Sequence, residues 1–221
     1  MRLLVCSSRN WFKLNEEISK TNTVKFITLE EDLTLDSVDQ FKPDYILFPH
    51  WNWIVKQEIH ENYNCVVFHT APLPYGRGGS PIQNLIMEGF QTSPVCAIKM
   101  TDKLDAGPIY SLSNISLEGN LNSIFLRLND AVNELIVKII SENPEPMAQV
   151  GEPHIFKRLT HSDNEITAGL DLEKLYDHIR MVDHPDYPHA FIMYGDVKIE
   201  FSNASLDGNS IEARCQITKL K

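Results

Sequence analysis

The sequence predicts an α/β fold, with a mostly parallel, doubly wound, Rossmann-like sheet and a small, mainly antiparallel C-terminal unit. Over the first 143 residues, short apolar runs alternate with amphipathic segments, as they do where helices connect parallel strands. After residue 156, one amphipathic segment precedes three apolar runs that are separated by the turn sequences Gly195-Asp196 and Asp207-Gly208-Asn209. We therefore expect an α/β domain over 1–143, a linker over 144–156 and a small α+β unit over 157–221.

Short apolar runs define the strands expected in the first half, at 3–7, 24–29, 44–48 and 65–68. Between them, apolar residues recur at helical spacing, and the expected helices cover 11–20, 33–41 and 53–60. Pro49 is expected to end the third strand, because proline has no N–H to donate to a sheet. The prolines and glycines of 72–79 are expected to exclude regular structure after the fourth strand.

Ser80-Pro81 is typical of a helix start, in which a side-chain cap is followed by proline in the first turn. This helix should reach Gly89 and be followed by strands at 95–100 and 109–117. The strongest helix is expected at 122–141, where apolar side chains recur every three or four residues, and Pro144 follows its end. The C-terminal unit should contain a helix at 172–181 and strands at 190–194, 197–201 and 211–217.

Composition limits the partners and the compartment. A net charge of −10 disfavours nucleic acid, because binding to phosphates depends on Lys and Arg. The four cysteines are far apart and lack metal-site spacing, so we expect reduced thiols and no disulfide framework. No apolar run approaches the ~20 residues that span a bilayer. The apolar run at residues 3–6 is too short for the apolar region of a signal peptide. We expect a cytoplasmic protein with no nucleic-acid or membrane partner.

Three polar loops follow expected strands, at 7–11, at 49–53 and from His69 onward. The carboxyl ends of parallel strands share one edge of the sheet, where ligands bind. His69 is therefore either a functional group or a hydrogen-bonded core histidine, and its local sequence does not separate the two. Trp51 and Trp53 are similarly either packing residues or a platform for a ligand.

Two other kinds of site are not favoured. Gly76, Gly78 and Gly79 lack the Lys-Ser or Lys-Thr of a phosphate loop, so they are expected to let a substrate approach the backbone. The C-terminal histidines lie at positions 161, 178, 184 and 189, which is not metal-site spacing, and no metal is expected. The neighbouring Arg180, His184 and Tyr187 are expected to form a solvated helix end and turn.

A set of motifs resembles the 10-formyltetrahydrofolate-dependent formyltransferase family, in order and spacing, over residues 1 to about 140. The motifs are His69, Leu73-Pro74, Gly76-Arg77-Gly78, Ser80-Pro81-Ile82-Gln83 and Leu104-Asp105-Ala106-Gly107-Pro108-Ile109. Residues 154–200 are more weakly similar to the C-terminal region of the members that act on tRNA. The family also includes glycinamide ribonucleotide and nucleotide-sugar formyltransferases.

The resemblance implies roles for the matched residues. His69 would orient and deprotonate the attacking amine and stabilise the tetrahedral intermediate, and Asp105 would hold the imidazole and relay a proton through water. The implied folate-binding residues are Trp51, Asn52, Trp53, Ile54, Thr101, Asp102, Lys103 and Leu104. The implied substrate-binding residues are Ser8, Arg9, Asn10, Trp11, Arg77, Gly78, Gly79 and Ser80.

One position departs from the family pattern. Val67 stands where the family has an asparagine that donates to the formyl oxygen, and valine has no side-chain donor. Loss of one such donor costs ~10²–10³ in rate. Asn52, Thr70, Asn84 or a backbone N–H are the candidate replacements. The alternative function is therefore a formyltransferase-like protein that binds folate or a nucleotide sugar with weak or no catalysis.

We expect the acceptor to be the amine of a nucleotide-linked amino-deoxy sugar. Residues 151–221 hold eight Lys and Arg against twelve Asp and Glu, which disfavours tRNA, and no phosphate loop of the glycinamide ribonucleotide branch follows Ser7. Tyr75 to Pro81 is similar to bacterial sugar N-formyltransferases of surface-glycan biosynthesis, with Arg9 and Arg77 for the diphosphate. The identity of the sugar and a homodimer through the C-terminal strands both remain open.

Overall fold

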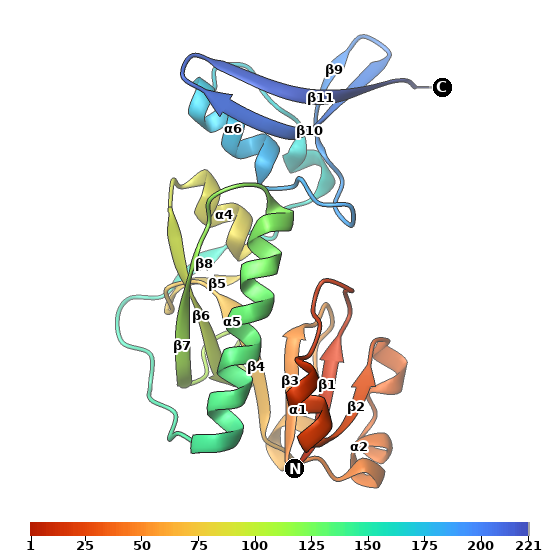
Figure 1. The fold of residues 1–221 in the computed structure, drawn as a ribbon, viewed down its shortest axis with the longest axis vertical. Coiled ribbons are helices and arrows are strands. Elements are labelled where there is room, and N and C mark those ends of the chain that lie inside the picture. The colour runs from red at the N-terminus through yellow and green to blue at the C-terminus, as the bar shows by residue number, and fades with distance from the viewer. Residues whose placement is uncertain (221) are drawn as a thin grey trace.

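A computed structural model describes residues 1–220 and contains one six-stranded sheet and two smaller sheets (Figure 1). The large sheet has the order β2-β1-β3-β4-β6-β7, in which the first four strands are parallel, β6 runs antiparallel to them, and β7 runs antiparallel to β6. Its strands are β1 (Arg2–Ser7), β2 (Thr23–Ile27), β3 (Tyr45–His50), β4 (Cys65–Thr70), β6 (Thr92–Lys99) and β7 (Ile109–Ser116). The predicted mostly parallel α/β fold is confirmed.

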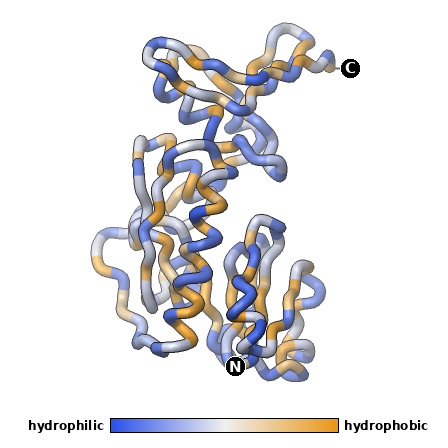
Figure 2. The backbone as a smooth tube through the Cα atoms, in the orientation of Figure 1, coloured by the Kyte–Doolittle hydropathy of each residue, from blue (hydrophilic) through white to orange (hydrophobic). Residues whose placement is uncertain are grey.

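Helices cover both faces of this sheet. α1 (Glu16–Thr21), α4 (Pro81–Met87) and α5 (Leu121–Glu142) contribute to one apolar core, whereas α2 (Leu35–Phe41) and α3 (Gln57–Asn62) contribute to the other. A short 3-10 helix, η1 (Glu30–Asp32), precedes α2. Along α5 the apolar residues recur every three or four positions and lie against the sheet, and Figure 2 shows the matching alternation of hydropathy. Burial of this stripe is the reason for the long helix.

Two expected helices begin later than predicted, and one strand ends later. Residues 11–14 are not helical because Asn15 caps α1, its Oδ1 accepting from Glu17 N at 2.8 Å. α3 likewise begins at Gln57 and not at residue 53. β3 continues through Pro49 to His50, since the register between β1 and β3 shifts there and a residue without an N–H is tolerated at such an irregularity.

The C-terminal residues form a separate three-stranded antiparallel sheet at one end of the molecule (Figure 1). It has the order β11-β10-β9 and packs on α6 (Leu172–Arg180), and η2 (His161–Asn164) precedes that helix. Its strands are β9 (Ala190–Tyr194), β10 (Val197–Asp207) and β11 (Ser210–Lys219), joined by turns at the two predicted sequences. β10 and β11 extend several residues beyond the expected runs, because they pair with each other over most of their length.

The segment 144–156 makes long-range contacts with the α/β body. Met147 and Ile109 exchange two backbone hydrogen bonds of 2.7 and 2.9 Å. β8 (His154–Phe156) pairs in parallel with β5 (Tyr75–Gly78), in the region where no regular structure was expected. The glycines there permit the unusual dihedral angles of this short strand. The division of the chain at residues 143 and 156 stays a prediction.

Arg180 and His184 are buried, so the prediction of a solvated helix end was wrong. Arg180 is 4% exposed and donates to Asp177 Oδ1 at 2.7 Å, to Gly119 O at 2.9 Å and to the Leu117 carbonyl. These carbonyls belong to the loop between β7 and α5. The guanidinium therefore joins the end of α6 to the α/β body.

Within residues 1–220, no helix has both the length and the apolar character needed to cross a membrane. The same residues hold no cluster of three His, Cys, Asp or Glu side chains suited to a metal ion. Cys6, Cys65 and Cys96 are buried, Cys215 is exposed, and all four are free thiols.

Candidate active site

The structure brings His69 and Asp105 together, although they are 36 positions apart. His69 lies near the carboxyl end of β4 and is 7% exposed, and Asp105 lies in the loop between β6 and β7. His69 Nδ1 is 3.5 Å from Asp105 Oδ2, which also accepts a 2.9 Å hydrogen bond from Gly78 N. β4 and β6 are antiparallel neighbours, so Lys99 pairs with Val66 near the start of β4, and the loop that follows brings Asp105 back to His69.

The other ring nitrogen of His69 determines its tautomer. Nε2 is 2.8 Å from the carbonyl oxygen of Gly76. A carbonyl oxygen can only accept, so Nε2 carries a hydrogen and the neutral ring has its lone pair on Nδ1, toward Asp105. Nδ1 is then the ring nitrogen that can take up a proton, and the carboxylate oxygen of Asp105 lies 3.5 Å from it. His69 is therefore both a hydrogen-bonded, buried histidine and a base directed at a carboxylate.

The glycine loop makes room for another part of this chain. Gly76 has φ +84°, and a Cβ there would lie 2.7 Å from Phe156 Cε2. A Cβ on Gly79 would lie 2.5 Å from Arg158 Cβ. Close packing against residues 156–158 therefore requires glycine at these two positions, and the approach of a substrate to this loop stays a prediction.

Two predicted substrate residues make contacts within the chain. Ser80 does not cap α4 as expected, because it has φ +51° and its Oγ accepts from Leu159 N at 3.1 Å. Arg77 donates through Nε and Nη2 to Gln149 Oε1, at 3.0 and 2.6 Å. The Arg77 guanidinium is thus engaged by Gln149.

The first two polar loops meet at His50, the last residue of β3. Ser8 N donates to His50 O at 2.9 Å, and Ser8 Oγ lies 3.0 Å from His50 Nδ1. The Trp11 ring stacks on Phe125 at 5.2 Å and meets the His50 ring edge-on at 6.2 Å, so Trp11 is a packing residue in this structure. Asn10 is exposed.

Two guanidinium groups lie around His50. Arg9 is 5.7 Å from the centre of the Tyr187 ring, and its buried Nε has no hydrogen-bond partner within residues 1–220. Arg158 approaches Asn52 Oδ1 at 3.5 Å. Burial, then the charges of Arg9 and Arg158, lowers the pKa of His50 to about 4. His50 is therefore neutral near pH 7 and leaves the cationic charge to the arginines.

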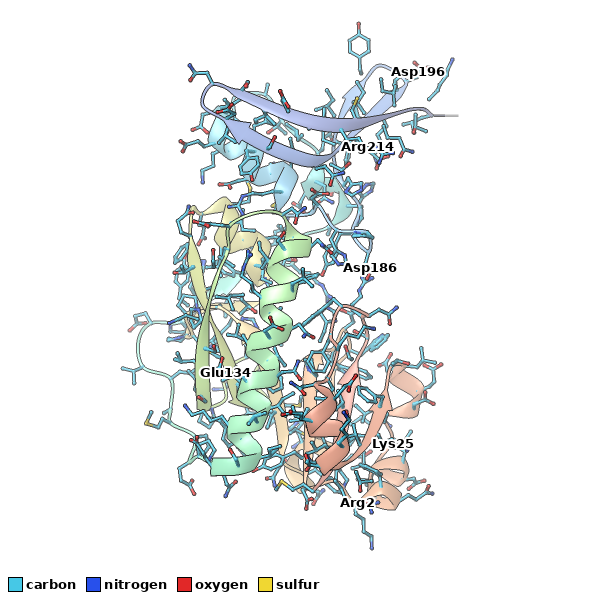
Figure 3. All side chains as sticks on the ribbon, in the orientation of Figure 1. Arg2, Lys25, Glu134, Asp186, Asp196 and Arg214 are labelled. Atoms are coloured by element: carbon cyan, nitrogen blue, oxygen red, sulfur yellow. The ribbon has the colours of Figure 1, made fainter. Side chains whose placement is uncertain are left out.

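Sequence reasoning found Arg9 but missed His50, Arg158 and Tyr187 as site residues. His50 had a usable signal, because it lies two residues after a predicted buried strand. Arg158 and Tyr187 had none, since each reaches the site only through packing of the 154–159 segment and of the 184–189 turn. Asp186, labelled in Figure 3, marks that turn below the C-terminal sheet.

The predicted folate residues divide into two groups. Trp51 packs on Phe48 and Trp53, and its buried Nε1 has no partner within residues 1–220. Ile54 and Leu104 project outward and are 92% and 71% exposed. The other loop residues contact their surroundings: Asp102 lies 3.5 Å from His60 Nε2, and Thr101 Oγ1 donates to Lys103 O at 3.2 Å.

Val67 projects on the same face of β4 as His69, because side chains two residues apart share a face. Thr70 lies on the opposite face and is excluded as a replacement donor. Asn84 is also excluded, since its amide nitrogen already faces the carbonyls of Gly79, Ser80 and Lys157. Asn52 and a backbone N–H remain as candidates, and the Asn52 oxygen faces Arg158 while its nitrogen has no acceptor within residues 1–220.

Comparisons with known proteins agree with this fold. A sequence-family model described as "Methionyl-tRNA formyltransferase, C-terminal domain" matches residues 161–218. Methionyl-tRNA formyltransferase of Campylobacter curvus is 26% identical over 82% of this chain, and the chain spans 61% of that enzyme's length. A 4-N formyltransferase of Francisella tularensis is 14% identical, with a TM-score of 0.66 over 88% of this chain and 93% of that one, and shares the fold.

The strongest of these matches extends over the full chain. A solved structure of methionyl-tRNA formyltransferase from Clostridium thermocellum is 39% identical and has a TM-score of 0.95, over 99% of both chains. An identity of 39% over nearly the whole chain shows membership of a family, whereas the 14% match shows only a shared fold. The chain therefore belongs to the formyltransferase family.

Proposed function

We propose that this protein transfers a formyl group from 10-formyltetrahydrofolate to the amine of a nucleotide-linked amino-deoxy sugar. The observation that supports it best is the pair of guanidinium groups, Arg9 and Arg158, around a neutral His50. Arg158 packs on Gly79, and the adjacent Gly78 binds the carboxylate of Asp105. An anion-binding pair thus lies next to the proposed catalytic pair.

The chemistry of this pair suits a diphosphate. Guanidinium groups present forked donors that match phosphate oxygens, and they stay charged at all relevant pH values. The buried Nε of Arg9 has no hydrogen-bond partner within residues 1–220, so this donor is unsatisfied by the protein itself. Arg158 takes the role first assigned to Arg77, which is engaged by Gln149. The sugar amine would then extend from the diphosphate toward His69.

The residues present also fit a folate donor. The buried Nε1 of Trp51 is a hydrogen-bond donor without a protein partner, beside the ring of Trp53. The exposed segment from Thr101 to Leu104 presents main-chain donors and acceptors. We assign the binding of 10-formyltetrahydrofolate to these residues. The amide of Asn52 would donate a hydrogen bond to the formyl oxygen, in place of the family asparagine at the position of Val67.

The mechanism uses the tautomer that Gly76 selects. When bound, 10-formyltetrahydrofolate supplies the formyl carbon, whose bond to N10 is exchanged for a bond to the acceptor amine, and N10 takes the proton that the amine loses. His69 Nδ1 accepts a hydrogen bond from the neutral amine and then its proton. Asp105 stabilises the imidazolium and, through water, passes the proton onward. Asn52 donates to the formyl oxygen as negative charge develops there.

An aminoacyl-tRNA is the second candidate acceptor, because the Clostridium thermocellum protein and the family model carry that activity in their names. Charge argues against it here. The chain has a net charge of −10, and residues 151–221 carry four more acidic than basic residues, by twelve against eight. Binding a tRNA stem requires an excess of basic residues.

We assign the catalytic residues His69 and Asp105 to an α/β domain over 1–143, and residues 157–221 to a separate C-terminal unit.

The deciding experiment incubates the protein with 10-formyltetrahydrofolate and a panel of amino-sugar nucleotides, and separately with methionyl-tRNA. Mass spectrometry of the acceptors then detects an added formyl group. Formylation of a sugar nucleotide, lost in His69→Ala and Asp105→Ala, supports the proposal, whereas formylation of methionyl-tRNA alone refutes the sugar acceptor. Binding of folate and a sugar nucleotide without any product would favour the alternative of a binding protein, for which Val67 is the supporting feature.

A further inference from the structure

We propose that Gln149 is a positioning residue, which holds the main chain at Asp105 so that the carboxylate faces His69. The inference rests on the proposed formyl transfer, in which Asp105 acts on the imidazole. Gln149 lies in the segment 144–156, which the sequence marks as a linker, and none of the motifs includes it.

Asp105 needs such support because its backbone has φ +49°. A residue other than glycine in this left-handed region costs about 1 kcal/mol or more, so surrounding contacts must maintain it. The preceding residues 101–104 are exposed and supply little packing. The carboxylate itself is held by one backbone hydrogen bond, from Gly78.

The amide of Gln149 supplies the missing contacts. Its Nε2 donates to Asp105 O and to Gly107 O, each at 2.8 Å, and so uses both hydrogens. Its Oε1 accepts from two nitrogens of Arg77. The reverse orientation would set the amide oxygen against two carbonyls and the nitrogen against a guanidinium, so the orientation is determined by chemistry.

These contacts close a ring around Asp105. Arg77 and Gly78 are neighbours in β5. Gly78 binds the carboxylate of Asp105 directly, while Arg77 reaches the carbonyl of the same residue through Gln149. The side chain and the main chain of Asp105 are therefore both held, directly or through Gln149, by the short strand β5. Gly76 of the same strand also orients His69. Loss of Gln149 removes the hydrogen bonds to the main chain at Asp105 and Gly107.

The test compares Gln149→Ala and Gln149→Glu with Val150→Ala, a matched control at the next residue, which is 89% exposed. Gln149→Glu keeps the acceptor for Arg77 but loses both donors. We expect either Gln149 variant to lower kcat by about 10- to 100-fold with KM within about threefold, since a misplaced catalytic group costs this much. The control should change neither.

A double-mutant cycle separates positioning from general destabilisation. If Gln149 acts through Asp105, then Gln149→Ala should cost less than about threefold in an Asp105→Asn background. Equal loss in both backgrounds would overturn the proposal. So would a kcat of Gln149→Ala within twofold of the parent.

A second measurement does not depend on turnover. Gly78 N–H is bonded to Asp105 Oδ2, so its native-state hydrogen exchange should accelerate about tenfold or more in Gln149→Ala and not in Val150→Ala. Unchanged exchange would contradict the role of Gln149. If the parent protein formylates no acceptor, the proposed function fails, while the exchange of Gly78 still decides whether Gln149 positions Asp105.

Discussion

Replacing Arg180 with methionine should destabilise the protein by about 3–5 kcal/mol, the cost of removing one partner from a buried charge pair. The guanidinium is 4% exposed and satisfies the carbonyls of Leu117 and Gly119 and the carboxylate of Asp177. A hydrogen bond to a charged donor contributes about 1.5–3 kcal/mol, so the bonds to the two carbonyls alone give about 3–6 kcal/mol, which overlaps this range. Methionine fills most of the stem volume but leaves these oxygens without a donor.

Urea unfolding followed by circular dichroism measures the change in the free energy of unfolding. Arg214→Met is the matched control, because Arg214 is exposed on β11 (Figure 3) and should change stability by no more than about 0.5 kcal/mol. Arg180→Lys should fall between the two, since an ammonium lacks the fork that reaches separate acceptors. A loss below 1 kcal/mol in Arg180→Met would refute the view that this residue joins the C-terminal unit to the body.

Further predictions concern His50 and the formyl-oxygen donor. In an NMR titration His50 should have a pKa near 4, and Arg9→Met should raise this pKa by removing a nearby positive charge. An unchanged titration midpoint would contradict the position of Arg9 beside His50. The folded-state pKa of His50 lies below the ordinary 6.5, so the unfolded chain binds the proton first as the pH falls. The free energy of unfolding should therefore be at its full value above pH 6.5 and decrease by up to about 3 kcal/mol as the pH falls toward 4. His50→Gln should flatten this part of a stability–pH profile. Asn52→Ala should lower kcat by about 10²–10³ in the parent but by much less in a Val67→Asn background; equal losses would mean that Asn52 is not the replacement donor.

Much of the fold was predictable from local pattern. Continuous apolar runs marked β1 and β4 because strands buried on both faces have no polar side. The turn sequences around Gly195 and Gly208 located the C-terminal hairpins, since glycine reaches the dihedral angles that tight turns require. The resemblance likewise paired His69 with Asp105, which the structure brings within 3.5 Å.

Features that depend on distant partners had no local signal. β3 passes through Pro49 because its neighbour β1 is irregular there, and β5 forms because β8 arrives from almost 80 residues away. The same holds for the fine geometry of the site. Apolar periodicity and turn chemistry act over a few residues, so the sequence alone determined most of the strands and helices of the large sheet and the C-terminal hairpins. Arg158 beside Asn52 and Gln149 beneath Asp105 depend on contacts across 106 and 44 positions, which only the packed chain creates.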